Sequence, residues 1–98
     1  ITITPDTIIN VVSEHLNISP DDIRSKKRNQ DIATARQIVM YLCRQYVVIS
    51  LKSIGNAVGG KDHTTVMNGI KRIEDKMKSD ASFKNTMDTI IKKLNPVT

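Results

Sequence analysis

Signals for the start of a helix recur along this chain and leave little room for a β-sheet. Thr4-Pro5 and Ser19-Pro20 each place a side-chain hydroxyl just before a proline, an order that is typical of a helix N-terminus. Asp31 and Ser50 can cap two later helices, and another helix begins near Asp62. The helices are expected at about 5–16, 20–25, 32–47, 51–58, 62–77 and 80–94. The chain is therefore predicted to be all-α, with about six helices.

Apolar residues within these segments recur every three or four positions, as one buried face of a helix requires. The side chains expected to face inward are Ile8, Ile9, Val12, Leu16, Ala35, Val39, Leu42, Cys43, Tyr46, Val66, Ile70, Ile73, Met77, Phe83, Met87, Ile90 and Leu94. The β-rich triplet at 47–49 is expected to be a helix end and a loop. A chain of 98 residues can bury one core, so 1–98 is interpreted as a single domain.

The net charge of +5 is unevenly distributed along the chain. Residues 1–23 contain four acidic side chains and no Lys or Arg, so the remaining residues, with 15 basic and six acidic side chains, carry +9. Such asymmetry indicates a polyanionic partner, either nucleic acid or an acidic membrane surface. Two Tyr, one Phe and no Trp offer few platforms for stacking unpaired bases, which favours duplex DNA.

The stretch GNAVGGKD, residues 55–62, almost matches a P-loop. The last position fails, because Asp62 stands where Ser or Thr would help to bind Mg²⁺, and its carboxylate would repel a phosphate. The preceding SLKSI is also too short and polar for the buried strand that leads into a P-loop. The sequence therefore disfavours an ATP site and a catalytic role.

Other sites and locations are also constrained by residue counts. The single cysteine, Cys43, cannot form an internal disulfide or a cysteine-pair zinc site, and we expect it to be a small buried apolar residue. With only two histidines besides, no metal site is expected. No apolar run approaches the roughly 18 residues of a membrane span, and a cytoplasmic location is expected.

A short helix, a glycine turn and a longer helix, over about 51–77, make a helix-turn-helix arrangement. The second helix of this motif lies in the major groove, and here its N-terminal end reads Lys61-Asp62-His63-Thr64-Thr65. Lys can reach guanine, Asp can accept from cytosine N4, and Thr can offer a methyl group to thymine. Taken singly, Asp62 is more often a helix cap than a base reader, and His63 is usually a surface or core histidine.

A basic loop, RSKKR at 24–28, precedes the long third helix. Such a run is commonly a solvated surface, but a flexible basic arm beside a helix-turn-helix can also enter the adjacent minor groove, whose negative potential attracts Arg. Arg44 and Lys71 can pair with phosphates or be ordinary exposed helix charges. Phosphate contacts would fix the position of the protein without reading sequence.

Two stretches resemble a known family. SIGNAVGGKDHTTVMNGIKRIE (53–74) resembles the signature of the C-terminal DNA-binding domain of the bacterial replication initiator DnaA, and SKKRNQDIATARQIVMYLCR (25–44) resembles its basic loop and long helix. The resemblance implies a six-helix, Trp-repressor-like domain that binds double-stranded DNA at DnaA boxes of replication origins. It also implies that the chain is the C-terminal piece of a longer initiator, whose upstream domain would hold ATP and Mg²⁺. The piece itself would need no cofactor and would be monomeric, with regulatory proteins as further partners.

The resemblance also implies roles for individual residues. The residues that would read bases are Arg28, in the minor groove, and Lys61, Asp62, His63, Thr64 and Thr65, in the major groove. The residues that would hold phosphates are Lys26, Lys27, Arg44 and Lys71, together with the backbone amides near Leu51 and Lys52. Lys61 stands where the family usually has Arg, and its single ammonium lacks the fork with which Arg makes a two-pronged contact with guanine.

Other interpretations remain at this point. A transcriptional repressor with a similar motif would favour palindromic sites, because such repressors bind as dimers. A helical interaction module could use its positive face for an acidic protein, and a P-loop enzyme would bind ATP tightly. A contact with an acidic membrane is disfavoured, since no basic amphipathic helix stands out.

Overall fold

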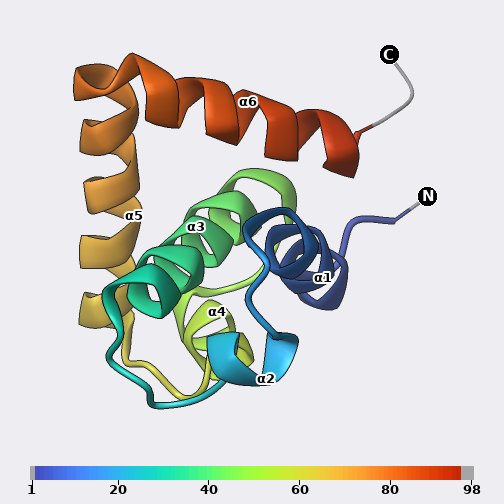
Figure 1. Ribbon diagram of the computed structural model, residues 1–98. Coiled ribbons are helices and arrows are strands. Elements are labelled where there is room, and N and C mark those ends of the chain that lie inside the picture. The colour runs from blue at the N-terminus through green and yellow to red at the C-terminus, as the bar shows by residue number, and fades with distance from the viewer. Residues whose placement is uncertain (1, 96–98) are drawn as a thin grey trace.

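The computed structural model describes residues 2–95 and shows an all-helical arrangement in that range (Figure 1). Its helices are α1 (Pro5–Leu16), α2 (Pro20–Ile23), α3 (Gln30–Tyr46), α4 (Leu51–Ala57), α5 (His63–Ser79) and α6 (Ala81–Leu94). The prediction of an all-α chain with six helices is therefore confirmed. Segment 47–49 lies outside the helices, as expected, and the Val48 side chain is fully exposed.

Side-chain caps explain where most of the helices begin. Thr4, Ser19 and Ser50 each accept a hydrogen bond, at 3.1 Å, from the backbone amide three residues later. Asp80 does the same for α6, with its Oδ1 3.1 Å from the Phe83 amide. Each bond satisfies one of the amides that a helix start leaves without an intrahelical acceptor. The predicted starts at 5, 20 and 51 are confirmed.

Three helix boundaries differ from the prediction by two residues, namely the end of α5 at Ser79 and the two that flank the basic loop. The long helix α3 begins at Gln30 with Asn29 in the cap position, and the Asn29 side chain makes no capping bond. The proposed cap at Asp31 is wrong, because Asp31 already lies in the first turn, where its Oδ1 accepts from the Ile32 amide at 2.9 Å. The helix α2 ends at Ile23, earlier than expected, because the chain turns there into the basic loop.

The core lies between α3 and the helices around it. The long helix α3 packs mainly against α5 and α1, while α6 leaves the end of α5 at a steep angle and runs across toward α1 (Figure 1). Of the residues expected inside, five are only half-buried against the core, namely Leu16, Tyr46, Ile70, Met77 and Phe83, and the others are buried. Cys43 is fully buried, and this desolvation raises the pKa of its thiol to about 12. Cys43 is therefore an apolar core residue, as predicted.

Candidate nucleic-acid interface

The turn between α4 and α5 closes on the backbone of Gly55. Its carbonyl accepts from the amides of Val58 at 3.3 Å and of Gly60 and Lys61 at 3.0 Å. A side chain at Gly55 would collide with the Lys61 carbonyl, so only glycine allows the turn to approach so closely. Gly59, with φ +92°, takes the left-handed conformation that reverses the chain. The glycines of GNAVGGKD therefore form the turn of a helix-turn-helix made by α4 and α5.

The first turn of α5 presents polar side chains to solvent. Asp62 is the N-cap, with its Oδ1 2.8 Å from the Thr65 amide, and this hydrogen bond lowers the pKa of the Asp62 carboxyl. His63, Thr64 and Thr65 are exposed. Within residues 2–95 the side chains of His63 and Thr64 make no hydrogen bond. Their donors and acceptors are therefore available to a ligand.

Lys61 lies just before this first turn. It is half-buried in a cleft between the N-terminal parts of α3 and α5, lined also by Arg36, Gln37 and Thr65. Desolvation lowers the pKa of Lys61, and repulsion from Arg36, Lys26 and Arg28 lowers it further. The turn before α5 also packs on the basic loop, since a side chain at Gly59 would collide with the Arg24 carbonyl. The basic loop and the start of α5 thus form one positive cluster.

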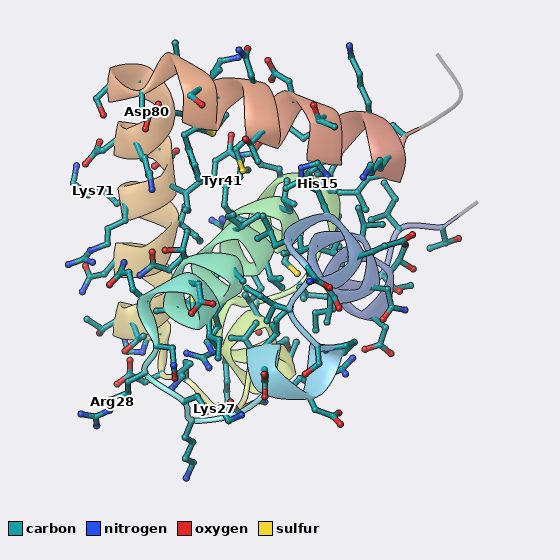
Figure 2. All side chains as sticks on the ribbon, in the orientation of Figure 1. His15, Lys27, Arg28, Tyr41, Lys71 and Asp80 are labelled. Carbon is teal, nitrogen blue, oxygen red and sulfur yellow. The ribbon has the colours of Figure 1, made fainter. Side chains whose placement is uncertain are left out.

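The basic loop uses some of its charges internally. Lys27 pairs with Asp22 at 2.8 Å, and Arg24 pairs with Asp6 at 3.1 Å. Lys26 and Arg28 are exposed and form no ion pair within residues 2–95. Figure 2 shows Arg28 extending outward from the loop on the side of the molecule where α5 begins. Of the expected loop contacts, Lys26 and Arg28 are the two with free charges.

The expected phosphate contacts on the helices fall into two places. Arg44, at the end of α3, and Leu51, at the start of α4, line a groove of about 350 Å³ together with Met67 of α5. Lys52 is exposed in the first turn of α4. The Ser50 side chain caps the Ser53 amide there, and the amides of 51 and 52 have no acceptor in the described part of the chain. Lys71 lies two turns along α5 from its start, 3.8 Å from Asp75 (Figure 2).

Three residues on this side of the molecule were missed by the sequence reasoning. Met67 is an exposed large apolar residue on α5, and Asn68 beside it is also exposed. Their spacing of three and four residues from Thr64 was the signal that both share its exposed face. The third residue, Arg36, is buried beneath the basic loop, and its local sequence gives no sign of that position.

The other expectations about sites concern absences. Among residues 2–95 no cluster of His, Cys, Asp and Glu could hold a metal ion. In the same range, no helix has both the length and the apolar character needed to cross a bilayer.

Comparison with known proteins identifies the family. The model of the bacterial DnaA protein helix-turn-helix matches residues 5–73. The chromosomal replication initiator protein DnaA of Lachnoclostridium phytofermentans is 50% identical over 95 residues, which are 97% of this chain and 21% of that protein. The DnaA proteins of Thermodesulfovibrio yellowstonii (41% over 92 residues, 94% of this chain and 21% of that protein) and Gloeobacter violaceus (50% over 72 residues, 74% and 16%) are also similar.

These matches cover a limited part of each relative. The chain spans about a fifth of the length of the curated relatives it matches. The matched segment is a helix-turn-helix unit and not a catalytic one, in agreement with the prediction from the failed P-loop. The chain therefore belongs to the bacterial DnaA helix-turn-helix family.

Proposed function

We propose that this chain binds double-stranded DNA sequence-specifically, with α5 in the major groove and the basic loop in the adjacent minor groove. The observation that carries this proposal is the packing of the turn before α5 on the basic loop, which brings the exposed Lys26 and Arg28 to the same region as Lys61 and the exposed side chains of His63 and Thr64. Positive charge attracts the duplex regardless of sequence, while free polar groups at a helix start can read base edges. Membership of the DnaA helix-turn-helix family supports the same conclusion.

The major-groove contacts divide among the residues of the first turn. Asp62 uses one carboxylate oxygen for the cap, and its second oxygen can accept from cytosine N4. The Thr64 and Thr65 methyl groups suit thymine, and His63 can donate to or accept from a base. Lys61 can reach guanine as a single donor, without the fork that Arg would supply.

Contacts with the sugar-phosphate backbone would hold α5 in the groove. Arg44 and the amides of Leu51 and Lys52 lie at one side of α5, and Lys71 lies further along it. Lys26 and Lys27 would hold phosphates beside the minor groove, Lys27 by exchanging its pairing with Asp22. Arg28 would enter the minor groove itself.

The lengths of the relatives support the proposal of a longer parent protein. The relatives are named chromosomal replication initiator protein DnaA, and the chain corresponds to about a fifth of their length. We therefore propose that residues 1–98 form the C-terminal DNA-binding domain of a cytoplasmic initiator that recognises DnaA boxes at an origin and so initiates and regulates chromosome replication. In this proposal ATP and Mg²⁺ belong to an upstream domain, and regulatory proteins are further partners of the same unit.

Fluorescence anisotropy tests the proposal. A labelled duplex carrying a DnaA box and a scrambled duplex of the same composition are titrated with the chain across a salt series. The proposal requires a preference for the box that persists as salt rises. His63→Ala, which removes a base-reading side chain, should reduce that preference by about 1–3 kcal/mol. Equal and steeply salt-dependent binding to both duplexes would leave only a non-specific basic surface.

A further inference from the structure

Arg36 lies in the first half of α3 and holds the basic loop from inside. Its Nε donates to the Ile23 carbonyl at 2.9 Å. Its Nη2 lies 2.8 Å from the Ser25 carbonyl, 3.2 Å from that of Lys27 and 3.3 Å from that of Asp22. One guanidinium therefore ties together the end of α2 and the loop up to the residue before Arg28.

The electrostatics of this contact are unusual for a buried charge. Arg36 is 5% exposed and forms no ion pair with a carboxylate within residues 2–95, and desolvation lowers the pKa of its guanidinium. Burying a cation is costly unless hydrogen bonds compensate, and here only backbone carbonyls do so. An apolar residue would fill the same space without the desolvation cost, but it would leave those carbonyls unbonded and the loop unattached.

The helix-turn-helix supports the same loop from the other side. A side chain at Gly59 would collide with the Arg24 carbonyl and lie 3.2 Å from the Ser25 carbonyl oxygen. The turn before α5 therefore packs directly on the loop backbone. With Arg36 on one side and the turn on the other, the loop is fixed between α3 and α5 and is not a free arm.

We propose that Arg36 is a positioning residue that fixes the basic loop relative to α5 and thereby sets which base pairs Arg28 can reach. The inference rests on the proposed function, because it assumes that loop and helix occupy adjacent grooves of one duplex. Successive base pairs are about 3.4 Å apart along the helix axis, so a displacement of the loop by that distance moves Arg28 by one base pair. Since Arg36 is buried, it acts through the loop and does not touch DNA.

The test selects binding sites from a library of random duplexes with the 98-residue chain, Arg36→Met, Arg36→Lys and His63→Ala. The wild-type chain should yield a motif with two blocks at fixed spacing, one read by α5 and one requiring A·T pairs. Preference for A·T in the second block should be about 5- to 150-fold per position. Replacing those pairs by inosine·cytosine, which lacks the minor-groove amino group of guanine, should be tolerated if that block is read from the minor groove.

Both Arg36 variants should keep the α5 block while the A·T preference falls toward onefold or spreads to neighbouring positions. His63→Ala should show the reverse pattern. The Arg36→Lys variant distinguishes a positioning role from a contribution of positive charge alone. The single ammonium of lysine keeps the charge but cannot bond the four carbonyls that the Arg36 guanidinium holds. The variant should therefore resemble Arg36→Met in selection while keeping the wild-type salt dependence.

Three results would overturn the inference about Arg36 while leaving the proposed function intact. They are a wild-type motif without an A·T block, an unchanged A·T block in both Arg36 variants, and an Arg36→Lys variant that keeps the full A·T preference. A uniform loss at all positions would assign Arg36 a purely structural role and would also overturn it. A wild-type library without any motif would instead overturn the proposed function, and this inference with it. Circular dichroism first shows which variants are folded, and Arg36→Lys carries the test if Arg36→Met is not.

Discussion

Replacing Gly55 by alanine tests whether the glycine turn delivers α5 in the way the structure shows. Helix propensity alone predicts stabilisation, because Ala is favoured over Gly by about 1 kcal/mol inside a helix. The structure predicts the opposite, since a Cβ at Gly55 would overlap the Lys61 carbonyl and force the turn away from α4. That movement breaks the bonds from the Gly60 and Lys61 amides to the Gly55 carbonyl, both 3.0 Å long.

The magnitude follows from these three effects. Breaking two hydrogen bonds costs about 1–3 kcal/mol together, at about 0.5–1.5 each. Overpacking of a close approach costs about 1–3 kcal/mol, against about 1 gained from propensity. Gly55→Ala should therefore lower the free energy of unfolding by about 1–5 kcal/mol, which corresponds to a fall in Tm of about 4–40 °C for a domain of this size.

Gly69→Ala is the matched control, since Gly69 also lies inside a helix. A Cβ there would meet the Met40 sulfur at 2.6 Å and the Gln37 Cγ at 3.2 Å, both in flexible side chains that can move. Gly69→Ala should stay within about 1 kcal/mol of wild type. Thermal and urea unfolding followed by circular dichroism measure both variants. If Gly55→Ala were as stable as the wild-type chain, or if both variants were equally destabilised, the account of the turn would be refuted.

Four further predictions concern the interface and the core. Asp62→Asn should keep the helix cap and the Tm but alter base preference, because an amide donates where the carboxylate only accepts. Asp62→Ala should alter base preference and also lower the Tm. If Asp62→Asn leaves base preference unchanged, Asp62 does not read a base. Lys71→Ala should weaken binding to all duplexes alike and reduce the slope of log affinity against log salt concentration by about one. Asp75→Asn, which frees Lys71 from its ion pair, should strengthen binding to all duplexes. A sequence-dependent effect of either variant would contradict a phosphate role for Lys71. Desolvation and neighbouring cations lower the pKa of Lys61 in the free chain, while a bound duplex favours its charged form. Affinity should therefore be constant below that pKa and fall as pH rises through the bound-state pKa. In titrations at alkaline pH the fall should begin at lower pH in wild type than in Lys61→Arg, and an identical onset in both would contradict the reasoning. Burial raises the pKa of Cys43 to about 12, so a thiol reagent at pH 8 should label the chain only as fast as it unfolds, and rapid labelling without denaturant would contradict the burial.

Much of the fold was predictable because its signals are local. The Ser19-Pro20 and Ser50 caps lie within three residues of the amides they bond, so their effect can be seen in a short stretch of sequence. The start of α3 was not predictable in this way. Its first helical bond runs from the Ala33 amide to the Asn29 carbonyl at 2.8 Å and involves no side chain, so nothing distinguishes Asn29 from Asp31 in the sequence.

The candidate site also has one part with a local sequence signal and one part without. The order of residues at the start of α5 shows which side chains a helix-turn-helix would present, and the structure finds His63 and Thr64 exposed there. The attachment of the basic loop was hidden, because the partners of Arg36 are backbone carbonyls 9 to 14 residues earlier in the chain. Carbonyls are the same in every residue, so no pattern of side chains marks them. A run of basic residues therefore suggests a flexible arm, whereas the structure shows a loop that is tied down.

The most direct test of the central claim is to map the contact surface by NMR. Amide chemical shifts of the ¹⁵N-labelled chain are followed during titration with a duplex carrying a DnaA box. The account predicts that the changes concentrate in the basic loop 24–28, at residues 51 and 52, and over 61–71, while the exposed face of α6 stays unchanged. Changes centred on α6 or on α1, with the loop and the start of α5 unaffected, would contradict the claim that these two elements together bind DNA.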